Sequence, residues 1–225
     1  MFAEGWRNME KQVELIERNL DVTRVGCKFS RVKSIERQSY RGRAARVIAN
    51  GKAGHASTTD GLSDDQLAQR AGEMAYVTVP KTLSFPRELI MSQQASSDVD
   101  QLTEADLRDW TRQLLHAMRQ DNPHVAIELN VSRIKEDVAL RNTNGGEAHL
   151  SRSWLEAETW IERHADGEVL VAVDRFATAQ VDGSHLDFAR RMARRFRWAK
   201  KPIEPVSGVQ SVIFSPSAFA SLLEP

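Results

Sequence analysis

The side chains that most often bind metal ions are few and scattered in this sequence. Its six histidines, at positions 55, 116, 124, 149, 164 and 185, include no pair at the i, i+4 spacing of a helical zinc site and no His-Glu-x-x-His run. Glu162 and His164 would share one face of a strand, but two ligands do not complete a site. We therefore expect ordinary surface and core histidines, with no metal site and no cofactor in this chain.

The sequence gives no more support for covalent catalysis or nucleotide binding than it gives for metal binding. Cys27, the single cysteine, has no obvious histidine partner in the sequence, and its β-rich context favours a small packed side chain. The sequence contains no Gly-x-Ser-x-Gly elbow and no Gly-x-Gly-x-x-Gly or Walker loop. No catalytic residue is predicted.

A basic run, RRMARRFRWAKK at residues 190–201, places seven cations in twelve positions. The favoured interpretation is a solvated helix face, with Met192 and Phe196 packed inward and the cations stabilised near the helix C-terminus by its dipole. The alternative is a basic helix that binds phosphates or acidic protein surfaces.

The turn sequence NTNGG, residues 142–146, lies between two strand-like runs. Its glycines permit positive φ, which favours a plain structural turn. The alternative is that this turn contacts a peptide, in which case Arg141, Asn142 and Asn144 are the candidate substrate-binding residues.

Composition is that of a globular chain of 225 residues, 41% hydrophobic and 28% charged. Lys plus Arg and Asp plus Glu both total 31, so net charge gives no argument for a nucleic-acid or membrane partner. A single cysteine fits a reducing compartment, and the sequence shows neither a signal-peptide core nor a stretch of about 18 apolar residues. We expect a cytoplasmic protein without membrane contact.

The first 60 residues predict an antiparallel meander. Strand-like runs occur at Val13–Glu17, Val22–Phe29, Val32–Arg37, Arg43–Ala49 and Lys52–Thr59. Asn50-Gly51 between the last two is a strong hairpin signal, because a type I′ turn needs positive φ at both central residues. Helices are predicted after the caps Ser63, with Gln66 three residues on, and Thr103, the second helix extending to about Gln120.

Strand patterns return after a long predicted loop over residues 78–101, where a domain boundary is plausible. Ser184 is then expected to cap a third helix, with Leu186, Ala189, Met192 and Phe196 on its inner face. The fold class is α+β: a meander, helices, and a second antiparallel strand set with the basic helix. The expected strands of that second set are 125–131, Val138–Leu140, His149–Ile161 and Glu168–Phe176.

Several stretches taken in order resemble one family. SIERQSYRGRAARVIANGKAGHASTTD, residues 34–60, is similar to the N-terminal signature of the TldD/PmbA proteins, often called modulators of DNA gyrase and known as peptidases. His55 departs from that signature, where an aromatic residue is more usual. LRNTNGGEAHL and GVQSVIFSPSAFASLL resemble later strand, turn and helix-start segments of the same region. The signature residues that match are Gly42, Arg46, Val47, Asn50, Gly51, Gly54, Ser57, Thr58 and Thr59.

The last 18 residues predict a buried strand over 208–214 and a helix start, with Ser215 as cap and Pro216 at its first position. In the metal-bearing branch of the family, a His-Glu-x-x-x-His run follows the paired leucines. Here Leu222-Leu223 precedes Glu224-Pro225. Two interpretations are open: the chain is the N-terminal part of a longer protein, or it resembles the branch without the metal motif, which Glu-Pro favours. Either way we expect the C-terminal metal-binding domain to be absent from residues 1–225.

The resemblance implies a two-subunit system in which unfolded peptides enter a cavity and are cleaved by zinc hydrolysis. Zinc belongs to the metal-bearing family members. This chain would supply cavity wall, peptide binding and contacts with a homologous or identical subunit, and would be inactive alone. The alternative is a non-catalytic binding protein that uses the 190–201 helix for nucleic acid or acidic protein surfaces.

Overall fold

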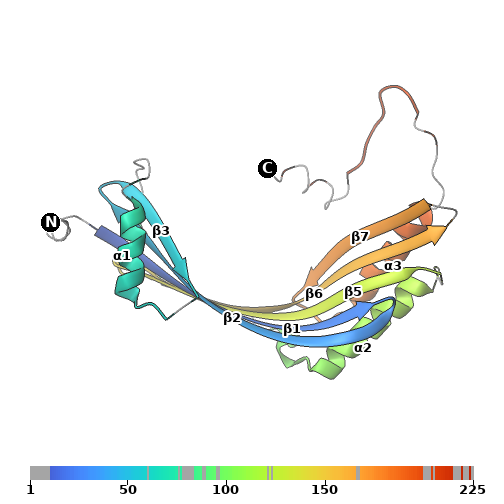
Figure 1. Ribbon diagram of the computed structural model, residues 1–225, viewed down its shortest axis with the longest axis horizontal. Coiled ribbons are helices and arrows are strands. Elements are labelled where there is room, and N and C mark those ends of the chain that lie inside the picture. Colours follow the sequence, from blue (N-terminus) through green and yellow to red (C-terminus); the bar gives the residue numbers. More distant parts are fainter. Residues whose placement is uncertain are drawn as a thin grey trace.

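The computed structural model describes residues 11–59, 61–75, 77, 84–87, 90–94, 97–120, 122, 124–165, 168–199, 204, 206–214, 219 and 223. Long strands and three α-helices make up most of this part of the chain, so the expected α+β class is confirmed (Figure 1). The elements are β1 (Lys11–Lys28), β2 (Arg31–Ala49), β3 (Lys52–Thr58), α1 (Asp64–Ala75), β4 (Ile90–Gln94), the 3-10 helix η1 (Asp98–Gln101), α2 (Glu104–Arg119), β5 (Ala126–Asn142), β6 (Glu147–Ala165), β7 (Glu168–Thr178) and α3 (Ser184–Ala199).

The strands form one sheet in the order β3-β2-β1-β5-β6-β4. β1 pairs with β5 antiparallel from Glu14 opposite Asn142 to Cys27 opposite Leu129. The outer edge of β6 pairs with β4, parallel, at residues 147–151 and with β7, antiparallel, at residues 155–165. The meander and the second strand set are therefore two halves of a single sheet, joined by β1 and β5.

Two tight turns connect the meander. Asn50 and Gly51 have φ of 52° and 69°, which confirms the hairpin predicted from this dipeptide. Phe29 and Ser30, with φ of 51° and 60°, turn the chain between β1 and β2 in the same way without a glycine. Ser30 is held in this conformation by its backbone N–H, which donates to the carbonyl of Ile127 at 2.9 Å.

Both hydrophobic cores lie on the same face of the sheet, here called the helix face. Leu15 and Val25 are both odd positions of β1, so their side chains point to one side. Leu15 packs against the smaller core, formed by α1 with β2, and Val25 belongs to the larger core, formed by α2 and α3 with β1, β5 and β6. In Figure 1 the strands bend into an arc with α2 on its convex side. The opposite face, here called the open face, is the concave one at that end of the sheet and carries no helix of the described chain.

The first two helices begin as the sequence predicts. Ser63 and Gln66 exchange hydrogen bonds, from the Ser63 N–H to Gln66 Oε1 at 2.9 Å and from the Gln66 N–H to Ser63 Oγ at 3.2 Å. Thr103 and Asp106 form the same capping box, and α2 ends at Arg119 with Gln120 as its C-cap. The starts of these two helices could be predicted from the sequence because each capping interaction joins residues only three positions apart.

The expected cap of the third helix is wrong. Ser184 is the first residue of α3, and its N–H donates to the Asp182 carboxylate at 3.0 Å. Its own hydroxyl is buried without a partner in the described part of the chain. Asp182 followed by Gly183, at a φ of 81°, supplies the turn that the prediction assigned to serine.

Two other segments differ from expectation. The predicted loop over 78–101 contains β4 and η1, because β4 finds a parallel partner in β6, more than 50 positions along the chain. Residues 206–214 are exposed and form no strand, so the buried strand expected at 208–214 is wrong within this structure. The helix predicted from Ser215 falls almost entirely outside the described residues.

His185 on α3 is a buried, neutral histidine. Its ring stacks on Trp110 of α2 with centroids 3.7 Å apart, and Nε2 lies 3.2 Å from Gln113 Oε1. Burial lowers its pKa from 6.5, and the nearby carboxylates of Asp182 and Asp187 oppose that shift only in part.

We expect the free energy of unfolding to decrease as the pH falls below about 6.5, because the unfolded chain then binds a proton that folded His185 resists. The decrease ends once the pH passes the lowered pKa of the folded state. Urea unfolding between about pH 7.5 and pH 5 measures this dependence. His185→Phe should remove that component, whereas His149→Phe, at an exposed position, should retain it; an unchanged pH profile in His185→Phe would contradict the assignment.

None of the helices in the described part of the chain is long and apolar enough to span a membrane.

Candidate functional site

The open face of the sheet is the main surface that the described helices leave uncovered. In the middle of the sheet it carries apolar side chains at alternating positions, while the helix face there is polar. The alternation follows directly from strand register: each residue faces its partners on the two neighbouring strands. The apolar positions are Ile16, Leu20, Val22, Ile134, Val138, Leu140, Leu150 and Trp154.

A charged group interrupts this apolar surface at its centre. Glu136 of β5 is buried, with 3% of its side chain exposed, and lies between Arg18 of β1 and Arg152 of β6. Nε and Nη2 of Arg18 both lie 2.6 Å from Oε1, and the same atoms of Arg152 both lie 2.6 Å from Oε2. Burial alone would raise the pKa of Glu136, but hydrogen bonds and charge from Arg152 and Arg18 outweigh it and lower the pKa. The carboxylate is therefore ionised at neutral pH and fixes both guanidinium groups.

Towards β7 the open face becomes an exposed apolar patch. Val173 lies opposite Trp160 in the β6–β7 ladder, and Val169 and Val171 share their face. The exposed fractions are 45% for Trp160, 56% for Val169, 39% for Val171 and 52% for Val173. Large contiguous apolar patches on a soluble domain mark interaction surfaces.

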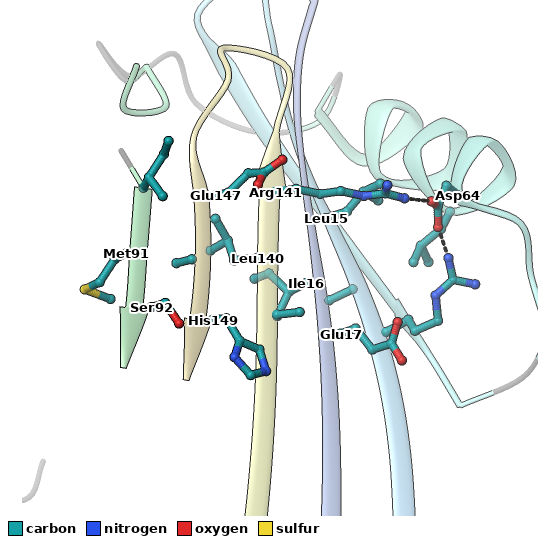
Figure 2. A pocket seen from close by; sticks show the side chains of 16 residues that line it. Leu15, Ile16, Glu17, Asp64, Met91, Ser92, Leu140, Arg141, Glu147 and His149 are labelled. Carbon is teal, nitrogen blue, oxygen red and sulfur yellow. Dashed lines mark hydrogen bonds and ion pairs between the residues drawn. The ribbon is translucent and has the colours of Figure 1, made fainter. Parts of the chain in front are cut away.

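A second candidate site is a cavity of about 540 Å³ lined by the start of α1, by residues 15–17 near the start of β1, by residues 139–141 at the end of β5, and by β4. Asp64, in the first turn of α1, forms ion pairs with Arg43 of β2 and with Arg141 of β5. Figure 2 shows Arg141 reaching across the sheet to Asp64, with His149 and Glu17 further down the same cavity. Arg141, one of the three predicted substrate-binding residues, therefore lines a cavity but is paired with a carboxylate of the chain itself.

Asn142 and Asn144, the other two predicted substrate-binding residues, form hydrogen bonds within their own turn and with neighbouring segments. Asn142 Oδ1 accepts from the N–H groups of Asn144 and Gly146 at 2.9 and 3.0 Å, and its amide donates to the carbonyl of Pro86 at 3.2 Å. The Asn144 amide donates to the Phe85 carbonyl at 2.9 Å and to Gln12 Oε1 at 3.2 Å. The turn thus holds residues 84–86 against the sheet, and a role for these side chains in substrate binding stays a prediction.

The basic run on α3 is partly neutralised by its surroundings. Arg195 pairs with Asp174 of β7, Arg190 pairs with Asp187 one helical turn earlier, and the Arg194 guanidinium lies 5.6 Å from the Trp198 ring centroid. A cavity of about 540 Å³ between α3 and α2 is lined by Arg190, Arg191, Arg194 and Arg197. The inner residues Ala189, Met192 and Phe196 are buried as predicted, and Leu186 is half-buried.

Metal-binding and nucleophilic side chains do not assemble in the described part of the chain. No three His, Cys, Asp or Glu side chains lie close enough there to hold a metal ion, so these residues do not fit the zinc ion of the metal-bearing family members. Cys27 is buried in the larger core, and burial raises the pKa of its thiol to about 11, far from a reactive thiolate.

Solved structures share this architecture. TldE from Thermococcus kodakarensis superposes with a TM-score of 0.66 at 12% identity, over 84% of this chain and 45% of its own. Two proteins named as modulators of DNA gyrase, from Thermotoga maritima and Bacteroides thetaiotaomicron, superpose with TM-scores of 0.64 and 0.60 at 10% and 12% identity, over 83% and 81% of this chain.

This chain has the TldD/PmbA fold. The resemblance read from the sequence is thereby confirmed at the level of the fold. The sequence matches no family model and no curated protein. The chain spans less than half the length of the three solved structures, 44–45% of each.

The arginine–glutamate group of the open face was not found by sequence reasoning. Its members are separated by 118 and 16 positions and meet only through the β1–β5–β6 ladder. One signal was present: Glu136 falls at a position whose neighbours on the same strand face, Ile134 and Val138, are apolar. A lone carboxylate in an apolar alternation predicts either a strand end or a buried partner.

Proposed function

We propose that this chain is the peptide-binding, non-catalytic part of a TldD/PmbA-type peptidase system. Its open face forms part of the wall of a cavity that admits unfolded peptides, and the chain contacts a homologous or identical subunit. Zinc and the hydrolytic step are supplied by polypeptide outside residues 1–225.

The observation that supports this proposal most directly is the curved open face, which none of the described helices covers. An extended peptide presents side chains alternately to its two sides, as the sheet does, so an apolar sheet face suits unfolded segments of varied sequence. The exposed Trp160 and the valines of β7 offer the apolar contacts, and Trp is the residue type most often dominant in binding. The missing metal cluster in the described residues is consistent with a binding role but does not carry the proposal.

We expect the 225-residue chain to bind a fluorescently labelled, unstructured peptide without cleaving it. Trp160→Ala should weaken binding about tenfold, as loss of one aromatic contact of about 1.4 kcal/mol. Fluorescence anisotropy measures the affinity, and mass spectrometry of the incubated peptide measures cleavage.

Trp198→Ala is the matched control, because Trp198 is also exposed, at 65%, but lies on α3 away from the open face. An equal loss of peptide affinity in both variants would contradict the proposal. Cleavage of the peptide by the chain, if a chelator stops it, would also contradict the proposal. Binding of duplex DNA that is lost in Arg191→Glu with Arg194→Glu, without binding of peptide, would instead support the alternative nucleic-acid role of α3.

A further inference from the structure

We propose that Arg18 and Arg152 form an anchor for a peptide carboxylate at the centre of the open face. The ligand is an extended acidic peptide segment whose carboxylate is flanked by apolar side chains. This inference rests on the proposed function and specifies which peptides that surface prefers.

The three side chains of this group differ in their exposure to solvent. Glu136 is almost fully buried, whereas 58% of the Arg18 side chain and 51% of the Arg152 side chain are exposed. A buried carboxylate is costly unless it is paired and hydrogen-bonded, and here both of its partners keep about half or more of their side chains in contact with solvent. Here the carboxylate lies beneath two arginines whose outer surfaces face away from it.

Both arginines retain hydrogen-bond donors that Glu136 does not use. Each guanidinium uses Nε and Nη2 towards one oxygen of Glu136. In the described part of the chain, Nη1 of neither arginine has a hydrogen-bond partner. A guanidinium has five N–H donors, so each arginine retains donors for a further acceptor, and Glu136 restricts the rotamers of both in advance.

The charges of the three side chains do not cancel. Two guanidinium groups share one carboxylate, which leaves one net positive charge at the centre of the group. The neighbouring positions on the open face, one step along each strand, hold no carboxylate. These positions are Ile16, Leu20, Ile134, Val138, Leu150 and Trp154.

An apolar surround strengthens the attraction for an anion, because fewer water molecules screen the charge. The Arg152 guanidinium also lies 5.1 Å from the Trp154 ring centroid, which holds its plane next to an apolar contact surface. A carboxylate accepts a fork of two N–H donors well, and apolar residues on either side of it would cover Leu20, Leu150 and Trp154. The complementary ligand is therefore acidic at one position and apolar around it.

The test compares two labelled peptides that differ only at one central residue, Glu or Gln, within the same apolar flanks. The wild-type chain should bind the Glu peptide about tenfold more tightly, the effect of one charge-assisted hydrogen bond at about 1.4 kcal/mol per tenfold. Arg18→Gln and Arg152→Gln should each abolish that preference while the Gln peptide binds as before. The preference should also decrease as sodium chloride is added.

Arg41→Gln is the matched control. Arg41 is paired with Glu17 and is 70% exposed, but it lies on the helix face of the same sheet. Circular dichroism and thermal unfolding establish that each variant is folded. An equal loss of preference in Arg41→Gln would mean a general charge effect and would overturn the anchor.

The remaining outcomes separate this inference from the proposed function. Equal binding of Glu and Gln peptides by the wild type overturns the anchor alone, provided that Trp160→Ala still weakens both. Failure of the wild type to bind either peptide overturns both proposals. A competition experiment covers the last outcome: inorganic phosphate and unlabelled Glu peptide are each added to the complex with labelled Glu peptide. If phosphate displaces the labelled peptide at concentrations as low as the unlabelled peptide does, the site binds phosphate, and the carboxylate assignment is overturned.

Discussion

Gly54→Ala is expected to destabilise the chain by about 3 kcal/mol, a large fraction of the stability of a typical domain. A methyl group at this position would lie 1.9 Å from the carbonyl oxygen of Ala71 and 2.5 Å from the amide nitrogen of Ala75. Both contacts are with the backbone of α1, so no side-chain rotamer can relieve them. The helix would have to move away from β3, and the packing of its Leu67 in the core with Ala45 and Val47 of β2 would be lost in part.

Gly42→Ala is the control for this substitution. Gly42 lies in β2 of the same sheet, its φ is not positive, and a methyl group there meets nothing within 4 Å. We expect its effect on stability to stay within about 0.5 kcal/mol. Urea denaturation of both variants measures the difference, and equal stabilities would mean that α1 does not pack directly on Gly54.

Gly54 also shows what the sequence could and could not predict. Its place in the hairpin after Asn50-Gly51 followed from local turn chemistry, and that hairpin is present. Its contact with α1 depends on a helix that begins ten residues later and folds back over the strand. Propensities and caps act over a few residues, so they locate such a helix but not the strand residue beneath it.

Apart from 208–214, the predicted strand runs lie almost entirely within observed strands, but their bounds were wrong for a related reason. The sequence suggested separate runs at Val13–Glu17 and Val22–Phe29, whereas β1 is continuous from Lys11 to Lys28. Apolar residues move from the helix face at Leu15 to the open face at Leu20 and return to the helix face at Val25. Alternation on a single face is the usual sequence signal of a strand, and that signal is interrupted where the apolar positions change face. It occurs because the two cores cover only the ends of the strands, while the centre is apolar on the other side.

The same property explains why the candidate anchor was not predicted. Arg18 and Arg152 read separately as ordinary exposed charges on strands, and Glu136 shows only a carboxylate within an apolar alternation, without indicating its partners. Only the register of β1 with β5 and of β5 with β6 places them side by side. Pairing between distant strands has no signature within either strand, so the fold class was predictable and the site was not.

The second large loss of stability is expected for a substitution in the larger core, which is separate from the core beneath α1. Phe188 of α3 is fully buried in the larger core, with its ring centroid 5.4 Å from that of Phe176 on β7. Phe188→Ala removes most of this contact and leaves a cavity, so we expect a loss of about 3 to 5 kcal/mol. Phe29→Ala, at a 73% exposed position in the turn between β1 and β2, is the control and should cost less than about 0.5 kcal/mol.

Hydrogen exchange should then distinguish the two ends of the sheet. In Phe188→Ala, amide protection should decrease in α2 and α3 but not in α1, because none of the α1 residues belongs to the larger core in the described structure. Gly54→Ala should give the opposite pattern, and the two losses of stability should add in the double variant, since the sites share no partner. If either substitution alone exposes the amides of all three helices, the central part of the sheet transmits unfolding and the two cores act as one cooperative unit. Separate responses would mean that the open face can adjust at one end while the other end stays packed, and such adjustment would suit the proposed binding of unfolded peptides.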